Sequence, residues 1–93
     1  MDTNVTDNKE RHRFELRLDD RVSGWIDYFR TDDVVSMTHA EVQSDLRNQG
    51  LGERLVRDAL ADVRERELQV RPLCPFISAY VRRHPEVQDL VAG

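Results

Sequence analysis

The sequence predicts a mixed α/β (α+β) domain in which an antiparallel strand meander is followed by a β-α-β crossover and a second helix. Apolar and polar residues alternate over three segments between residues 14 and 42, and this is the period of half-buried strands. The period then changes, because apolar residues recur at helical spacing from Leu51 to about Glu67. A short apolar segment, a proline and a second amphipathic stretch follow. The predicted order of elements is therefore β-β-β-α-β-α.

The first half of the chain carries the predicted meander. Strands are expected over residues 14–18, 22–28 and 34–42, separated by polar turns at residues 19–20 and 31–33. Short connections of this kind join antiparallel neighbours, whereas parallel strands need a longer crossover.

Residues 1–10 precede the meander and are polar, with Val5 the only apolar side chain after Met1. A segment of this composition buries too little apolar surface to offset the entropy that ordering costs. We therefore expect a disordered tail over residues 1–10 and a single domain over residues 11–93.

The second half of the chain carries the crossover. After the helix that begins at Leu51, a fourth strand is expected over residues 68–73. A second helix is expected over residues 76–83, with Pro75 in its first turn, where no N–H is lost. Residues 86–93 should form a short helical turn or coil. A strand, a helix and a parallel strand in this order make a right-handed crossover, and ligands of such units bind at the carboxyl ends of the strands.

Composition narrows the class of protein. The 93 residues carry a formal net charge of −4, which argues against binding to nucleic acid, because that relies on dense Lys and Arg contacts with phosphate. No apolar stretch reaches the ~20 residues that span a bilayer, and residues 1–10 lack the apolar core of a signal peptide. Cys74 is the only cysteine, so no internal disulfide can form, which fits a reducing compartment. We therefore expect a cytoplasmic protein that binds neither nucleic acid nor membrane.

The loop before the long helix is the most informative motif. Arg47, Gly50 and Gly52 match the pattern Gln/Arg-x-x-Gly-x-Gly/Ala. Glycines before a helix let backbone N–H groups turn towards one point, and the helix dipole adds attraction for phosphate. Asn48 tolerates positive φ, so the loop can still bend there. We interpret the loop as a pyrophosphate cradle; the plain alternative is a helix entry that needs glycines only for its turn. A Rossmann loop is disfavoured, because its three glycines open a parallel sheet.

Three further side chains could carry chemistry. Cys74 stands just before Pro75, at the start of a helix whose dipole favours a nucleophilic thiolate, but a free cysteine is more often a small buried hydrophobe. His39 on the third strand could act as a general base or be structural. His84 could cap the end of the second helix. On spacing alone the structural interpretation is favoured for each, and without paired Cys or His spacings a zinc site is disfavoured.

Several motifs in order resemble a known family. They run from about Phe14 to Val91 and comprise His39 with Val42, Leu46-Arg47-Asn48-Gln49-Gly50-Leu51-Gly52, Pro72-Leu73-Cys74, Tyr80, His84-Pro85-Glu86 and Asp89-Leu90-Val91. Together they are similar to the GCN5-related N-acetyltransferase (GNAT) superfamily, in which the glycine loop is motif A. More specifically, the chain resembles the small stand-alone GNAT-like domains typified by bacterial YidJ-type proteins.

The resemblance implies a minimal GNAT-like fold that binds acetyl-CoA or CoA. It assigns the role of nucleophile or acetyl-bearing residue to Cys74, with His39 near it. Pyrophosphate binding then falls on Arg47, Asn48, Gln49, Gly50, Leu51 and Gly52, and further cofactor contacts fall on Val42, Tyr80, Arg83 and His84.

Three positions depart from the family pattern. Ala40 stands where a threonine usually follows the histidine, so a hydroxyl role is absent. Asn48 replaces a glycine, which reduces the freedom of the loop. Val87 replaces a tyrosine, which removes an aromatic contact near the C-terminal end.

The function that the resemblance implies is acetyl transfer from acetyl-CoA to an amine, either directly or through Cys74. The chain lacks the extra helices that build an acceptor pocket in larger relatives, so the expected acceptor is an exposed amine on a protein or a polyamine. The alternative is a non-catalytic CoA-binding sensor or interaction module, which the missing hydroxyl at Ala40 favours. A structural partner domain that binds no CoA is a third possibility.

Overall fold

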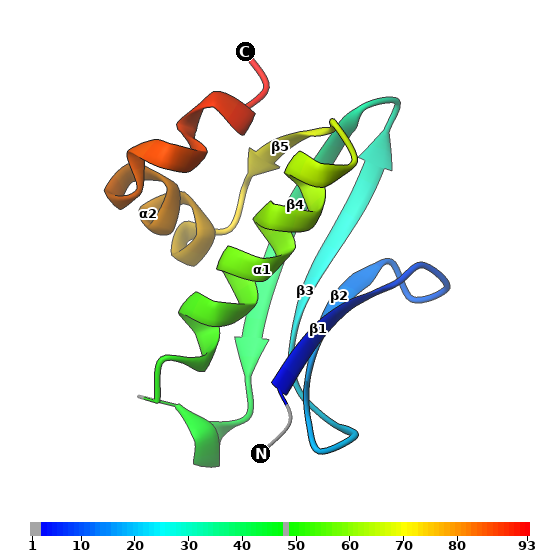
Figure 1. Ribbon diagram of the computed structural model, residues 1–93, viewed down its shortest axis with the longest axis vertical. Helices are drawn as coiled ribbons and strands as arrows, with labels where there is room; N and C mark the ends of the chain where they lie inside the picture. The colour runs from blue at the N-terminus through cyan, green and yellow to red at the C-terminus, as the bar shows by residue number, and fades with distance from the viewer. Residues whose placement is uncertain (1–2, 48) are drawn as a thin grey trace.

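The computed structural model describes residues 3–47 and 49–93. Its strands form one sheet in the order β1-β2-β3-β4-β5, in which only β4 and β5 pair in parallel (Figure 1). The elements in chain order are β1 (Thr3–Asn8), β2 (Arg13–Leu18), β3 (Arg21–Thr31), β4 (Val34–Val42), η1 (Ser44–Leu46), α1 (Leu51–Glu65), β5 (Gln69–Pro72), α2 (Pro75–Arg83) and η2 (Pro85–Leu90). This arrangement confirms the predicted fold class of a meander, a crossover and a second helix.

The expectation of a disordered tail is wrong for residues 3–8, which form the edge strand β1 paired antiparallel with β2. A strand at the sheet edge is held by backbone hydrogen bonds and needs little apolar surface of its own. Here Val5 alone packs against the core. Two arginines of the α1 region add contacts, because Arg54 Nη2 donates to the Thr3 carbonyl at 3.1 Å and Arg66 pairs with Asp7 at 3.0 Å. The sheet therefore begins before residue 11.

The turns of the meander lie where the sequence predicted them. Asp19 and Asp20 have φ of 48° and 71°, the left-handed pair of a tight two-residue hairpin. Asp32, between β3 and β4, has φ of 54°. Aspartate tolerates this region better than most residues, since its short side chain can hydrogen-bond locally.

Strand β4 contains an irregularity close to the end of its pairing with β5. Asp27 pairs with His39 and Tyr28 pairs with Met37, so Thr38 is an extra residue in β4, as in a β-bulge. The parallel pairing of β4 with β5 ends at Met37. There the Met37 carbonyl accepts hydrogen bonds from the N–H groups of both Leu73 and Cys74, at 3.0 and 3.1 Å. At this point β5 ends at Pro72, and the chain continues into α2.

Helix α1 forms the crossover from β4 to β5 and lies across the sheet (Figure 1). Its buried residues are the ones that helical spacing predicted: Leu55, Val56, Ala59, Leu60 and Val63. Helix α2 buries Ile77, Tyr80 and Val81 and packs against α1, β4 and β5. In the described part of the chain, none of the helices is long and apolar enough to cross a membrane.

Candidate functional site

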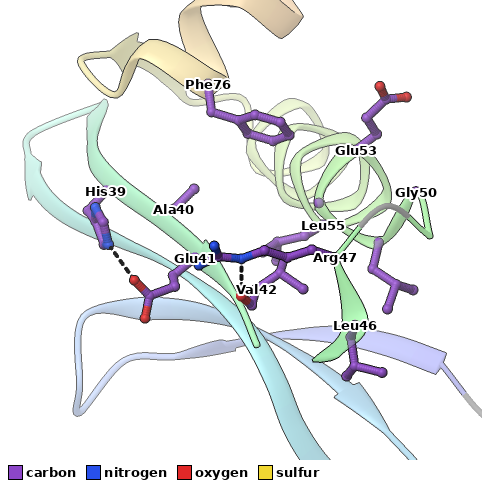
Figure 2. A pocket seen from close by; sticks show the side chains of 12 residues that line it. His39, Ala40, Glu41, Val42, Leu46, Arg47, Gly50, Glu53, Leu55 and Phe76 are labelled. Carbon is purple, nitrogen blue, oxygen red and sulfur yellow. Dashed lines mark hydrogen bonds and ion pairs between the residues drawn. The ribbon is translucent and has the colours of Figure 1, made fainter. Parts of the chain in front are cut away.

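The candidate site is a cleft beside the second half of β4, past the end of its pairing with β5 (Figure 2). It has a volume of about 550 Å³. Four parts of the chain line it, namely the second half of β4, the loop before α1, the first turns of α1 and the start of α2. The lining residues are His39, Ala40, Glu41, Val42, Leu46, Arg47, Gly50, Leu51, Gly52, Glu53, Leu55 and Phe76.

The β4 wall of the cleft presents backbone groups that no strand pairs. The N–H of Gln43 donates to the Ser23 carbonyl of β3 at 2.9 Å. The Val42 carbonyl belongs to the same planar peptide unit and therefore points the opposite way, into the cleft. Backbone direction alternates along a strand with a period of two residues, so the N–H groups of Ala40 and Val42 face the same side. Among the described residues, β5 pairs with β4 only as far as Met37.

The N-terminus of α1 forms one end of the cleft. Gly50 is the N-cap with φ of 75°, a left-handed conformation that strains other residues. None of the described side chains caps this helix, and a Cβ added at Gly50 would meet no atom within 4 Å. The first N–H groups of a helix have no partner within it and carry the positive end of its dipole. This end of the cleft is therefore suited to an anion.

The second glycine of the motif allows a close approach. A Cβ added at Gly52 would lie 3.1 Å from Phe76 Cζ and 3.7 Å from Val42 Cγ2. Any side chain at position 52 would push against the phenyl ring that forms the α2 side of the cleft. Gly52 therefore sets the spacing between α1, α2 and β4.

Arg47 lies in the cleft and is not ion-paired within the described residues. Its Nε donates to the Val42 carbonyl at 3.2 Å, and its side chain runs along the cleft towards Glu41 (Figure 2). A guanidinium bonded to a neutral carbonyl keeps its remaining N–H groups for a stronger acceptor.

His39 and Glu41 form a polar pair on β4. They stand two residues apart and so share a face, and His39 Nε2 lies 3.4 Å from Glu41 Oε1. Both side chains are exposed, at 55% for His39 and 41% for Glu41. Solvent or a substrate can therefore reach the carboxylate and the imidazole, and either group can accept a proton.

A family described as GCN5-related N-acetyl-transferase matches residues 13–90. The chain belongs to this family. Comparison with curated proteins gave no match.

Two solved structures share the GNAT fold of the chain. The solution structure of a GCN5-like protein from Staphylococcus aureus has a TM-score of 0.71 at 21% identity, covering 97% of this chain and 88% of that one. The ribosomal-protein-S18-alanine N-acetyltransferase from Escherichia coli has a TM-score of 0.59 at 20% identity. In that pair the match covers 69% of this chain and 43% of the enzyme. At these identities the likeness shows the fold alone.

Within this GNAT domain, Cys74 lies apart from the cleft-lining residues. It is the N-cap of α2, is 6% exposed and belongs to the hydrophobic core. Its backbone N–H donates to the Met37 carbonyl, where β5 ends. The structure thus brings His39 to the cleft and leaves the thiol of Cys74 in the core.

The predicted cofactor contacts on α2 also lie outside the cleft lining. Tyr80 is buried, and burial, assisted by the charge of Glu86, raises the pKa of its hydroxyl. The His84 ring stacks on Tyr80 with centroids 3.8 Å apart, and His84 Nδ1 donates to the Tyr80 carbonyl at 2.7 Å. His84 therefore caps α2, as the structural alternative expected. Arg83 is exposed on the last turn of α2.

The loop residues of the motif divide into three groups. Val42, Arg47, Gly50, Leu51 and Gly52 line the cleft. Gln49 is exposed and is not among the lining residues. Asn48 lies outside the described residues.

Sequence reasoning missed several residues that line the cleft, notably Glu41 and Phe76. A signal existed for Glu41, because it shares the period of His39 on the strand. Phe76 stands in the first turn of the second helix, and its contact with Gly52 and its place in the lining depend on how that helix packs.

Proposed function

We propose that this GNAT domain binds acetyl-CoA in the cleft and transfers the acetyl group to an amine. One observation carries the proposal: β5 ends opposite Met37, and beyond it a cleft runs from the unpaired edge of β4 to the start of α1, where none of the described side chains caps the helix. A ligand that fits this opening needs an anionic end and an extended arm with amide groups.

The residues at the start of α1 fit a pyrophosphate. Within the described residues the helix has no side-chain cap, and Gly50 and Gly52 carry no side chain that could cover its first N–H groups. Backbone N–H groups together with the dipole make such a helix end a ready anion site. Arg47 adds a guanidinium, which matches phosphate oxygens in a bidentate manner.

The free edge of β4 fits the amide-bearing arm. The Val42 carbonyl can accept from an amide of the ligand, and the Ala40 and Val42 N–H groups can donate to its carbonyls. When bound, acetyl-CoA supplies an activated thioester. A β4 N–H aimed at the acyl oxygen would stabilise the negative charge that develops there.

We assign proton removal to Glu41, with His39 as its positioning partner. An amine must lose a proton when its new bond to the acyl carbon forms and the carbon–sulfur bond breaks. Glu41 lines the cleft and is exposed on the side from which an acceptor can approach. Direct transfer is favoured over a route through Cys74, because the thiol is buried in the core.

We also propose which acceptor the domain uses and in which compartment it acts. An amine carries a positive charge at neutral pH, and a chain with net charge −4 attracts such acceptors weakly at long range. We propose an exposed protein amine or a polyamine, acting in the cytoplasm.

The test is calorimetric titration of CoA into the wild type and a Gly52→Val variant. The valine should weaken binding at least tenfold, because its side chain would displace Phe76 and narrow the cleft. Ala61→Val is the matched control, since it places the same β-branched residue on the exposed face of α1.

Three results separate the candidate functions. If the wild type does not bind CoA, both cofactor hypotheses fail. CoA binding without acetylation of any protein or polyamine amine would instead support the non-catalytic module. CoA binding with acetyl transfer supports the enzyme.

A further inference from the structure

Arg47 occupies part of the cleft that the proposed function assigns to the ligand arm. Its side chain runs along the cleft (Figure 2), and its Nε donates to the Val42 carbonyl at 3.2 Å. That carbonyl is one of the unpaired β4 groups, because the N–H of Gln43 in the same peptide unit faces β3. Arg47 thus lies on the cleft side of this carbonyl, where an incoming amide would have to approach, and the two compete for that side of the acceptor.

We propose that Arg47 is a specificity-determining residue that excludes pantetheine-type ligands lacking a pyrophosphate. This inference rests on the proposed binding of CoA in the cleft. In the absence of ligand, Arg47 blocks the free edge of β4, and it leaves the Val42 carbonyl when it binds a pyrophosphate. The same residue would then reject short thiols and thioesters and select nucleotide-bearing ones.

The strengths of the competing bonds support this exchange. In the structure the guanidinium has a neutral carbonyl as its acceptor, and no carboxylate of the described residues pairs with it. A phosphate is anionic and offers the guanidinium bidentate bonds between opposite charges, in place of its single bond to a neutral carbonyl. A pantetheine amide is neutral and gives Arg47 no such acceptor, so its binding does not compensate the loss of the Arg47 contact.

Arg47 has to move only its side chain to leave the Val42 carbonyl for the start of α1. The residue precedes Gly50 by three positions and lines the same cleft as the start of α1. A rotation of its side chain from Val42 towards the helix N-terminus changes rotamers without moving the strand. Its side chain is exposed, so the rotation breaks no core contact.

The experiment compares pantetheine and CoA as probes of the wild type and of Arg47→Ala. Binding is followed by the NMR shifts of the Ala40 and Val42 amides and by calorimetry, so no turnover is needed. Arg30→Ala is the matched control: Arg30 is exposed, and its Nε likewise donates to a main-chain carbonyl, that of Asp32 at 2.8 Å. Arg30 lies near the end of β3, next to the β3–β4 turn, whereas Val42 lies at the other end of β4.

The proposal predicts opposite changes for the two probes. Arg47→Ala should bind pantetheine roughly fivefold more tightly than the wild type, because one competing hydrogen bond is gone, and should bind CoA roughly tenfold more weakly. Arg30→Ala should leave both affinities unchanged. If Arg47 were only a phosphate ligand, CoA would weaken while pantetheine stayed the same, and that result would overturn the proposal. A wild type that binds no CoA is a different result, because it rejects the proposed function itself.

Discussion

Glu15 is a carboxylate buried in the sheet at 2% exposure. Burial by itself raises the pKa of this carboxyl, but hydrogen bonds from Arg13, Arg17 and Asn8 outweigh it and hold the pKa below the ordinary value of 4.5. The Arg13 bond is 2.7 Å and the Arg17 bond is 3.0 Å. A carboxylate whose pKa is lower in the folded state stabilises the fold above its unfolded pKa and loses that effect as the pH falls through the folded pKa.

Replacing Glu15 with glutamine should therefore destabilise the protein in a pH-dependent way. At pH 7 we expect the free energy of unfolding to fall by about 2 kcal/mol, because the amide turns a donor towards one guanidinium. The deficit should shrink as the pH drops below 4.5. Urea unfolding of the variant and wild type at several pH values measures this. Glu10→Gln, at an exposed position, is the control, and a deficit independent of pH would contradict the account.

The direct mechanism predicts different effects on kcat for substitutions of Cys74 and of Glu41. If transfer is direct, Cys74→Ala should keep kcat within about threefold, whereas Glu41→Gln should lower it by a factor of 10² or more, as for loss of a general base. The measurement is steady-state acetylation of an amine with acetyl-CoA. A loss for Cys74→Ala as large as that for Glu41→Gln, with an unchanged melting temperature, would restore the covalent route.

At the scale of elements, the bulge at Thr38 stands between two halves of β4. The half up to Met37 pairs with β5, which ends at Pro72, and the half from His39 to Val42 lines the cleft. A bulge bends its strand and increases the local twist. We therefore expect the bulge to set the direction of the half of β4 that lines the cleft.

Deleting Thr38 should distort the cleft while keeping the sheet. With the bulge gone, β4 should run straighter, which shifts its cleft-lining half relative to the start of α1, so CoA affinity should fall at least tenfold. Calorimetry measures the affinity, and circular dichroism checks the fold. Thr38→Ala is the matched control, because it removes only the hydroxyl bond to the Asp27 carbonyl. A deletion variant with wild-type affinity would show that the bulge does not shape the cleft.

At the scale of the molecule, the site joins both halves of the fold. The cleft draws on β4 from the meander and on α1 and α2 from the second half. A ligand in the cleft therefore contacts elements from both halves and stabilises the folded state. A second link between the halves lies at the sheet edge, where Asp7 of β1 pairs with Arg66 after α1 and accepts a hydrogen bond from Tyr28 at 2.5 Å.

Saturating CoA should accordingly raise the melting temperature. A ligand at 100 times its dissociation constant adds about 2.7 kcal/mol to the free energy of unfolding. For a domain of this size that corresponds to a shift of roughly 10 °C or more. Differential scanning calorimetry with and without CoA measures it. The Gly52→Val variant should show a much smaller shift, and an equal shift would mean that CoA binds elsewhere.

The sequence by itself determined the order and type of most elements. Apolar periods of two and of 3.6 residues identified β2, β3, β4 and α1, and the aspartate pairs located the turns, because both signals are local. The glycine motif located the start of α1 for the same reason.

Only the tertiary structure decided the rest. β1 looks like a polar tail, yet backbone pairing with β2 and contacts from Arg54 and Arg66 order it. The burial of Cys74, the stacking of His84 on Tyr80 and the approach of Phe76 to Gly52 depend on how α2 packs. The bond from Arg47 to Val42 likewise depends on a strand edge that is free because β5 ends at Pro72, opposite Met37. These features join residues far apart in the chain or rest on register, and a periodic pattern in one segment carries no information about either.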